Sequence, residues 1–477
     1  MQDSNLLTLL PLIVLAAAIV ILLLTLAFNR THLVAAALTL GGLALAFVTL
    51  FVPAAAPQVT PLLVVDGYTR FFVGLLLAAS FAVGVLSYNY LETRSGIPGE
   101  FYLLLLLATL GSAVLVASSH YASFFLGLEL LSVSLYSLIA YLRPAARGIE
   151  AAIKYLILAA ASSSFLLFGM ALVYAQTGTM EFARLATAQP PNANAENLVI
   201  LTGTGMIIVG FGFKLALVPF HLWTPDVYEG APAPVTAFIA SVSKGAMFAL
   251  LLRYFVPGEL QEFQPLFLAF AAIALASMIV GNLLALVQSN VKRILAYSSI
   301  AHIGYLLVAF LASGALAVNA VAFYLVSYFV TTLGAFGVVT VLSSGERDAD
   351  CVDDYRGLFS RRPGLAVAFT AMLLSLAGIP LTSGFVGKVY LVAAGVGSAL
   401  WLLVAVLVVT SAIGLYYYLR IVVAMYSPAP EAATPIGVSS LALGGSVALA
   451  ALTLLLVWLG VYPAPLIELI QAVAKFG

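Results

Sequence analysis

The sequence predicts an all-α protein that crosses a membrane about fourteen times, and three observations support this fold class. Of its 477 residues, 63% are hydrophobic and only 8% are charged, whereas soluble domains carry about 25% charged residues. Apolar stretches of about 20 residues, the length that crosses a bilayer, occupy most of the chain. The connections between these stretches are too short to form a soluble catalytic domain.

Helices are expected in the apolar stretches because lipid offers no partner for backbone N–H and C=O groups, and a helix pairs these groups internally. The first stretch is too long, and has too little positive charge before it, for a cleaved signal peptide, so we expect a permanent helix there. The predicted helices cover residues 6–28, 33–53, 71–91, 101–119, 121–142, 152–176, 197–222, 234–256, 264–287, 292–312, 317–343, 363–394, 398–426 and 437–463. An amphipathic tail is expected at 464–477.

Basic residues between the predicted helices divide unequally between the two sides of the membrane. Eleven lie in connections that share a side with the turn at 29–32, and four lie on the opposite side. Because Lys and Arg concentrate on the cytoplasmic side, we expect both chain termini outside. The larger group is Arg30, Arg94, Arg143, Arg147, Lys292, Arg293, Arg347, Arg356, Arg361, Arg362 and Arg420, and the smaller is Arg70, Arg184, Arg253 and Lys475.

Proline interrupts the seventh and the twelfth predicted helix. Lys214 precedes Pro219 by five residues in the seventh, and Lys388 follows Pro380 by eight residues in the twelfth. Proline removes a backbone donor and clashes with the preceding turn, so both helices are expected to break. The seventh and twelfth helices are five helices apart in the chain. This spacing favours two five-helix repeats, the second inverted, as in many ion transporters. The expected units are 1–100, 101–256 for the first repeat, 257–426 for the second, and 427–477.

Five ionisable residues lie in predicted membrane helices, although a charge at mid-bilayer costs about 2.5–3.5 kcal/mol. Glu129 lies about eight residues into its helix, roughly 12 Å from the helix start. Lys releases its proton readily when desolvated and keeps it near a carboxylate, whereas Arg stays protonated. The chain therefore has residue types suited to proton transfer at depth: Glu129, Lys154, Lys214, Lys244 and Lys388.

Structural interpretations remain open for several of these residues. Lys154 lies one helical turn from Glu150. The structural alternative is that these two residues form a simple ion pair and that the Lys154 side chain extends to the membrane interface. Three further lysines cannot all pair with Glu129, so purely structural ion pairs do not account for the set. His302 has ring nitrogens able to pass protons, and a hydrogen-bonded core histidine is an equal alternative.

Other classes of chemistry are not indicated by the sequence. Zero net charge without basic clusters argues against nucleic-acid binding. A single cysteine, Cys351, excludes a disulfide framework, a zinc cluster and an iron–sulfur site within this chain. Neither a phosphate-binding loop nor a dinucleotide fingerprint is present, so we expect no redox cofactor in this chain.

Five segments carry a family resemblance that covers nearly the whole chain. They closely resemble the N subunits of bacterial proton-pumping NADH:quinone oxidoreductase, respiratory complex I. The motif HLWTPDVYEGAPAPV is of the N type, whereas related cation/proton antiporter subunits read closer to HxWLPDAHxxAPxPVSA. The segments are GLELLSVSLYSLIAY (127–141), EAAIKYLILAAASSSFLLFGMALVYAQTG (150–178), FKLALVPFHLWTPDVYEGAPAPVTAFIASVSKGAMF (213–248), NVKRILAYSSIAHIGYLL (290–307) and LLSLAGIPLTSGFVGKVYL (373–391).

The resemblance implies roles for the buried charges by matching position. Glu129 corresponds to the family's helix 5 glutamate, and Lys154, Lys214, Lys244 and Lys388 correspond to its lysines in helices 6, 7, 8 and 12. It also implies fourteen helices with two inverted five-helix repeats. The expected mechanism changes Glu129–Lys214 pairing and passes a proton by way of Lys244 and water to Lys388.

The resemblance further implies a place in a larger assembly. NADH, FMN, iron–sulfur clusters and quinone are expected in partner subunits, and the partners include a neighbouring antiporter-like subunit and small membrane subunits. The expected location is the lipid bilayer of the bacterial inner membrane, with periplasmic termini. An Mrp-type cation/proton antiporter subunit is the alternative function, and a purely structural spacer subunit is a third.

Overall fold

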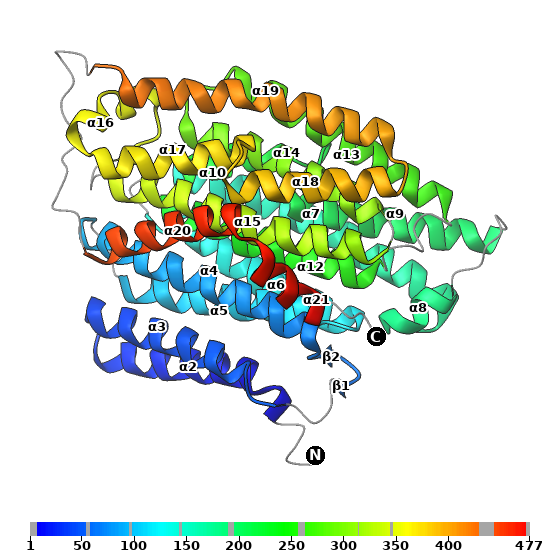
Figure 1. The fold of residues 1–477 in the computed structure, drawn as a ribbon. Helices are drawn as coiled ribbons and strands as arrows, with labels where there is room; N and C mark the ends of the chain where they lie inside the picture. The colour runs from blue at the N-terminus through cyan, green and yellow to red at the C-terminus, as the bar shows by residue number, and fades with distance from the viewer. Residues whose placement is uncertain are drawn as a thin grey trace.

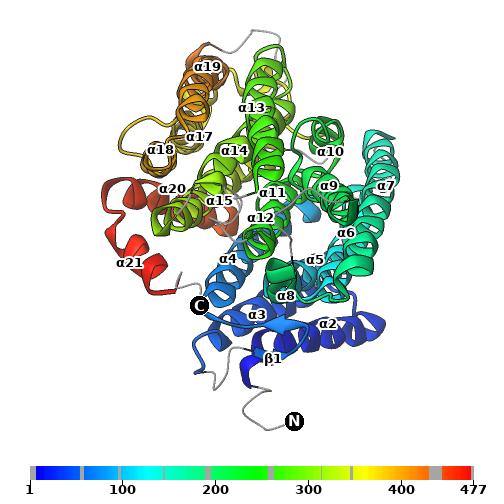
Figure 2. The same cartoon turned by 90° about the vertical axis from the view of Figure 1, so that its right-hand side faces the viewer.

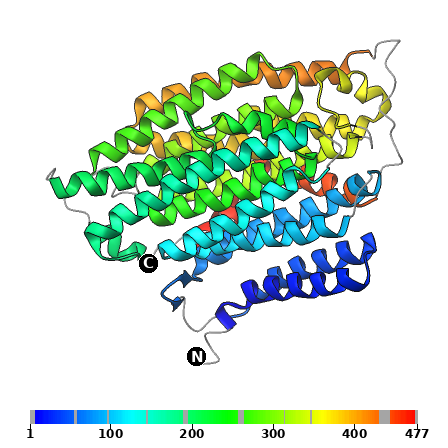
Figure 3. The same cartoon turned by 180° about the vertical axis from the view of Figure 1, so that it is seen from behind.

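The computed structural model describes residues 7–53, 58–94, 98–142, 146–188, 195–255, 263–312, 314–343, 347–428 and 443–473. Its helices run largely side by side in one bundle, with α2 and α3 at one edge and α19 at the other (Figure 1). The same arrangement is visible from behind (Figure 3). The predicted fold class is confirmed.

The first part of the chain follows the predicted order of helices closely. Leu10–Phe28 forms the first long helix where 6–28 was expected, and most other ends agree within a few residues. The elements are α2 (Leu10–Phe28), α3 (His32–Thr49), β1 (Gln58–Thr60), β2 (Leu63–Val64), α4 (Gly67–Glu92), α5 (Pro98–Ala117), α6 (Tyr121–Ile139), α7 (Ala146–Thr177), α8 (Phe182–Ala188), α9 (Ala195–Leu215), α10 (Trp223–Gly230), α11 (Ala233–Phe238) and α12 (Lys244–Tyr254).

The second part continues with helices of the same kind. The elements are α13 (Gln264–Leu286), α14 (Val291–Leu311), α15 (Ala315–Leu342), α16 (Leu358–Arg361), α17 (Pro363–Ala377), α18 (Ser383–Gly397), α19 (Trp401–Tyr426), α20 (Leu443–Val461) and α21 (Ala464–Val473). Thirteen helices among the described residues are long and apolar enough to cross a membrane. The shorter helices α17 and α18 follow one another and supply one further crossing, which gives the predicted fourteen.

Both predicted helix breaks are present. Helix α9 ends at Leu215, and Ala216 has a left-handed φ of 62°. Helix α17 ends at Ala377, and Gly378 has a φ of 86°, a conformation that glycine adopts without steric cost. The predicted end of the seventh helix at residue 222 was wrong, because the chain resumes as the half-helix α10 and continues to Gly230.

A third interruption was not predicted. One turn of π-helix, Ile239–Ser243, separates α11 from α12 and ends directly before Lys244. Such turns insert an extra residue and are frequent at functional sites. No proline or glycine lies within Ile239–Ser243, so the usual sequence signals of a helix distortion are missing.

The centre of the bundle is formed by α11, α12, α14 and α15. The span from Ala233 to Tyr254 and helix α14 are buried over nearly their whole length, apart from Arg253 and Tyr254 at the end of the first and Arg293 near the start of the second. Seen along the bundle, these helices lie in the middle, while α2, α7 and α19 lie at the edges (Figure 2). Lys244 and Lys292, two charged groups on these central helices, are therefore enclosed by protein atoms.

Two connections contain short elements that the all-α prediction did not include. Strands β1 and β2 pair in an antiparallel hairpin, with Gln58 opposite Val64 and Thr60 opposite Leu63. Helix α8 lies in the polar connection 177–196. The hairpin is too short to bury an apolar face. Its sequence therefore lacks the alternation of apolar and polar residues that predicts a strand.

Ion pairs join connections at the two ends of the bundle. At one end, Arg253 pairs with Asp66 at 2.8 Å. At the other end, Asp348 pairs with Arg94 at 3.0 Å and with Lys292 at 2.8 Å. Two residues used in the orientation argument, Arg143 and Lys475, lie outside the described residues.

Asp348 holds three elements together. Its carboxylate accepts hydrogen bonds from Tyr90 of α4 at 2.8 Å, from Arg94, and from Lys292 of α14. Lys292 also donates to the backbone oxygen of Ala231 at 2.7 Å. Burial alone raises the pKa of Asp348, but Lys292 and Arg94 outweigh burial and hold this pKa below its ordinary 3.8.

We predict that Asp348→Asn lowers the free energy of unfolding by about 3–5 kcal/mol, because the buried Lys292 and Arg94 lose their counter-charge. A lowered folded-state pKa means that the stabilisation is complete above about pH 4 and is lost as the pH falls further. Thermal unfolding of the purified protein between pH 3 and pH 7, values that bracket the ordinary pKa, measures both effects. Asp353→Asn, in the exposed pair with Arg356, is the control and should change little. Equal melting temperatures for the two variants would contradict the prediction.

Candidate functional site

Lys214 lies in the last turn of α9, directly before the first helix break. Its side chain is buried, and its ammonium nitrogen Nζ donates to Ser132 Oγ at 2.6 Å and to Tyr155 OH at 3.5 Å. The ammonium group also lies 5.3 Å from the centre of the Tyr155 ring. Carbonyl groups at a helix C-terminus carry partial negative charge, so this end of α9 suits a cation.

Glu129 is half-buried on α6 and does not contact Lys214. Its carboxylate accepts a hydrogen bond from Ser163 of α7 at 2.6 Å. Among the described residues, no ion pair joins Glu129 to Lys214 in this structure, and the expected change in their pairing during turnover stays a prediction. Ser132 follows Glu129 by one turn on α6 and is the residue that meets Lys214. Three residues along a helix place two side chains on one face, which brings the carboxylate and the ammonium group to the same region without contact.

Lys244 begins α12 at the centre of the bundle. Its Nζ donates to Ser299 Oγ of α14 at 2.6 Å, and the ring of Tyr228 lies 5.5 Å away. The π-helical turn before Lys244 sets the direction in which this side chain leaves its helix. Lys244 is only 1% exposed, so its environment is made by protein atoms.

Lys388 reaches back from α18 to the end of α17 across the second helix break. Its Nζ donates to the backbone oxygens of Leu376 at 2.8 Å and Ala377 at 2.9 Å, and to Ser411 Oγ at 2.6 Å. These carbonyls have no partner within α17 because the helix ends there. Lys214 and Lys388 thus lie on opposite sides of their breaks in the sequence, yet both place a cation at the negative end of a half-helix.

His302 on α14 is hydrogen-bonded through both ring nitrogens. Its Nδ1 lies 2.7 Å from Tyr324 OH, and its Nε2 lies 3.2 Å from Tyr418 OH. Tyr418 also contacts Ser298 one turn earlier on α14. These partners fit a hydrogen-bonded core residue and a proton carrier equally, since both roles require hydrogen bonds to the ring nitrogens.

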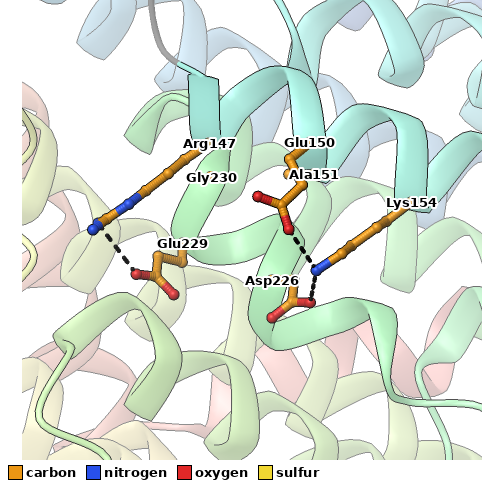
Figure 4. A pocket seen from close by; sticks show the side chains of 7 residues that line it. All are labelled: Arg147, Glu150, Ala151, Lys154, Asp226, Glu229 and Gly230. Atoms are coloured by element: carbon orange, nitrogen blue, oxygen red, sulfur yellow. Dashed lines mark hydrogen bonds and ion pairs between the residues drawn. The ribbon is translucent and has the colours of Figure 1, made fainter.

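Lys154 belongs to a separate, partly exposed cluster. Its Nζ pairs with Glu150 and with Asp226 of α10, each at 2.8 Å. The predicted partner Glu150 is confirmed, whereas Asp226 was missed because it is distant in sequence. These side chains and those of Arg147 and Glu229 line a cavity of about 190 Å³ (Figure 4).

Arg293 extends this cluster to α14. It donates to Asp226 and to Glu229, each at 2.9 Å, so that the half-helix α10 is tied both to α7 and to α14. Tyr155, the neighbour of Lys154 in sequence, points inward and contacts Lys214. The ring of Trp223, at the start of α10, lies 4.8 Å from that of Tyr155. The contacts of α10 thereby extend to the surroundings of Lys214.

One group of side chains in the described part of the chain has the spacing of metal ligands. It consists of Asp350, Cys351 and Asp354 in the connection after α15. Arg347 already donates to both carboxylate oxygens of Asp354, at 2.8 Å and 2.6 Å. The group is remote from the buried lysines in the sequence and none of its members contacts them.

Three of the buried lysines share one property. Lys214, Lys244 and Lys388 form no ion pair with any carboxylate of the described residues; their partners are hydroxyl groups and backbone carbonyls. A buried ammonium ion without a counter-charge is unfavourable. This arrangement does not fit a set of structural ion pairs.

A membrane bundle with two broken helices and unpaired buried lysines is typical of proteins that move ions. The chain belongs to the NADH:quinone oxidoreductase/Mrp antiporter transmembrane family, whose model matches residues 118–414. It is 55% identical to the NADH-quinone oxidoreductase subunit N of Nitrosospira multiformis over 485 residues, which cover 98% of this chain and 96% of that protein.

Solved structures agree with this assignment. A chain of respiratory complex I from Thermus thermophilus, determined with bound aureothin, matches with 34% identity and a TM-score of 0.81, covering 96% of this chain and 98% of that chain. A chain of the archaeal membrane-bound sulfane sulfur reductase matches with 25% identity and a TM-score of 0.81, covering 99% and 96%. A chain of the Mrp complex from a Dietzia species matches with 21% identity and a TM-score of 0.82, covering 98% and 96%, and shows the shared fold alone.

We predict that Arg293→Gln loosens α10, because the half-helix loses both of its ion pairs to α14. A change of about 1–2 kcal/mol in local opening corresponds to a five- to thirty-fold rise in amide exchange. Hydrogen–deuterium exchange of peptides covering 223–230 measures this effect. Arg356→Gln, which removes an exposed pair elsewhere, is the control. Unchanged exchange in Arg293→Gln would show that these contacts do not position α10.

Proposed function

We propose that this chain is the N-type membrane subunit of a proton-pumping NADH:quinone oxidoreductase, and that it moves protons while partner subunits oxidise NADH and reduce quinone. The observation that carries the proposal is the set of three buried lysines without carboxylate partners. The 55% identity to an NADH-quinone oxidoreductase subunit N supports the assignment of this chain to that complex. The Mrp chain shares the fold at only 21% identity, so no observation favours the antiporter alternative.

The proposed path begins near Glu129 and Lys214 and ends at Lys388. A change in the charge of Glu129 alters the electrostatic potential at Lys214 through a region of low dielectric constant, where no ion pair needs to form. The proton then passes by way of Lys244 and His302 to Lys388. Coupling is reciprocal, because each charge that biases its neighbour is biased by it in return.

The two five-helix repeats are part of the proposal, with boundaries at 101–256 and 257–426. Their support is the equivalent packing of matched helices. Helix α5 packs against α6 as α13 packs against α14, and α7 packs against α9 as α15 packs against α17 and α18. Each repeat thus supplies one broken helix and one buried lysine beside the break.

We assign the cofactors NADH, FMN, iron–sulfur clusters and quinone to partner subunits. The proposed partners are a neighbouring antiporter-like subunit, small membrane subunits and the bilayer lipids. The excess of basic residues on one side favours a bacterial inner membrane location with periplasmic termini.

We predict that Lys214→Met and Lys388→Met each suppress proton pumping and coupled NADH oxidation by about ten-fold or more, because positioned proton-transfer groups contribute about 10²–10⁴-fold. Proton uptake and NADH oxidation in vesicles containing the assembled complex are the measurements. Arg356→Gln serves as the control for a lost surface charge. Wild-type pumping in either assembled lysine variant would overturn the proposed role.

Purification in a mild detergent tests the assembly separately. We expect a flavin- and iron–sulfur-containing peripheral arm to co-purify with this chain. Isolation with only small membrane partners, together with Na⁺/H⁺ exchange by the purified complex, would instead establish the antiporter function.

A further inference from the structure

The hydrogen-bond partner of Lys244 is itself shared. Ser299 Oγ lies 2.6 Å from Lys244 Nζ, 2.7 Å from Tyr328 OH and 3.4 Å from Tyr228 OH. A serine hydroxyl has one proton to give and two lone pairs, so it can accept from the lysine while it donates to a tyrosine. Ser299 therefore connects Lys244 of α12 to Tyr328 of α15 without a gap.

Tyr328 lies beside His302 on a buried polar strip between α14 and α15. Tyr324 and Tyr328 are one turn apart on α15, and Ser299 and His302 are nearly one turn apart on the facing side of α14. Tyr324 OH forms a hydrogen bond of 2.7 Å with His302 Nδ1. The centres of the Tyr328 and His302 rings are 5.7 Å apart. All four side chains are buried.

The neighbouring aromatic residues show where hydroxyl groups are placed. Phe323 and Phe329 flank the two tyrosines on α15 and are equally buried. Phenylalanine would fill positions 324 and 328 with almost the same volume, since it lacks only the hydroxyl group. The tyrosines occupy the positions whose ring tips meet Ser299 and His302, so the hydroxyl groups serve more than packing.

We propose that Ser299 and Tyr328 are proton-carrying residues that connect Lys244 to His302. The Lys244 ammonium gives a proton to Ser299 Oγ as the Ser299 hydroxyl proton passes to Tyr328 and the Tyr328 proton passes to His302. Lys244 becomes a neutral amine, His302 becomes an imidazolium, and both hydroxyl groups regain one proton each. This assignment rests on the proposed function and adds the residues that complete its middle section.

The hop from Tyr328 to His302 is the controlled step. Among the described contacts, these two residues meet through their rings and not through a hydrogen bond, because both imidazole nitrogens are engaged by Tyr324 and Tyr418. Tyr328 can deliver a proton only when one of these tyrosines releases the ring. In this structure the chain of hydrogen bonds is continuous from Lys244 to Tyr328 and is interrupted between Tyr328 and His302.

The test uses Tyr328→Phe and Ser299→Ala in the assembled complex reconstituted into liposomes. Both variants should lower coupled NADH oxidation and proton pumping by about ten-fold or more. Both should also raise the solvent deuterium isotope effect on turnover, because proton transfer becomes rate-limiting. Ser299→Thr retains a hydroxyl group and should recover most of the rate lost in Ser299→Ala.

Matched controls separate proton transfer from packing. Tyr355→Phe removes a buried tyrosine hydroxyl that donates to the backbone oxygen of Ala349, and Ser87→Ala removes a buried serine hydroxyl that donates to Val83. Neither contacts the lysines, so turnover and its isotope effect should stay at wild-type values. A structural role for Ser299 and Tyr328 would leave the isotope effect unchanged.

Lys388→Met, measured in parallel, distinguishes the relay from the function on which it rests. Wild-type pumping in Tyr328→Phe and Ser299→Ala, with pumping lost in Lys388→Met, overturns the relay alone. Wild-type pumping in all three variants overturns the proposed function as well. Loss in all three, with the isotope effect raised in the two hydroxyl variants, supports both.

Discussion

The two helix breaks are the constraint on which the rest of this structure depends. A continuous membrane helix hides its backbone polar groups, whereas a broken helix leaves carbonyl oxygens that must find partners inside the protein. At the second break, the ammonium group of Lys388 is the partner of Leu376 and Ala377. The break therefore creates the site that makes a buried lysine tolerable, and the lysine satisfies the break.

Hydroxyl groups take the place that carboxylates occupy in an ordinary ion pair. Ser132, Ser299 and Ser411 each lie 2.6 Å from a lysine ammonium group. A carboxylate at these positions would favour the charged lysine strongly in a medium of low dielectric constant. A hydroxyl group stabilises the ammonium form weakly and can accept or donate a proton. The proposed loading and unloading of protons requires such a balance, whereas Asp348 and Asp226 form true ion pairs with basic side chains elsewhere in the chain.

Much of this organisation could be predicted from the sequence, for identifiable reasons. The helices follow from apolar length, and the breaks follow from Pro219 and Pro380. The π-helical turn before Lys244 had no such signal, and Asp226 lies 72 residues from Lys154, its partner. The change in Glu129–Lys214 pairing that the resemblance implies stays a prediction. The relative placement of two helices decides which side chains meet, and in this structure Lys214 donates to Ser132, which the sequence did not single out.

The central claim is that the buried lysines change protonation during turnover. Isotope-edited infrared difference spectroscopy of the complex labelled with ¹⁵N-lysine, comparing the resting and the turning-over enzyme, tests this claim most directly. We predict a difference band at the ammonium deformation frequency that shifts with the label and loses intensity in Lys388→Met. Identical lysine signals in the resting and the turning-over enzyme would contradict the account.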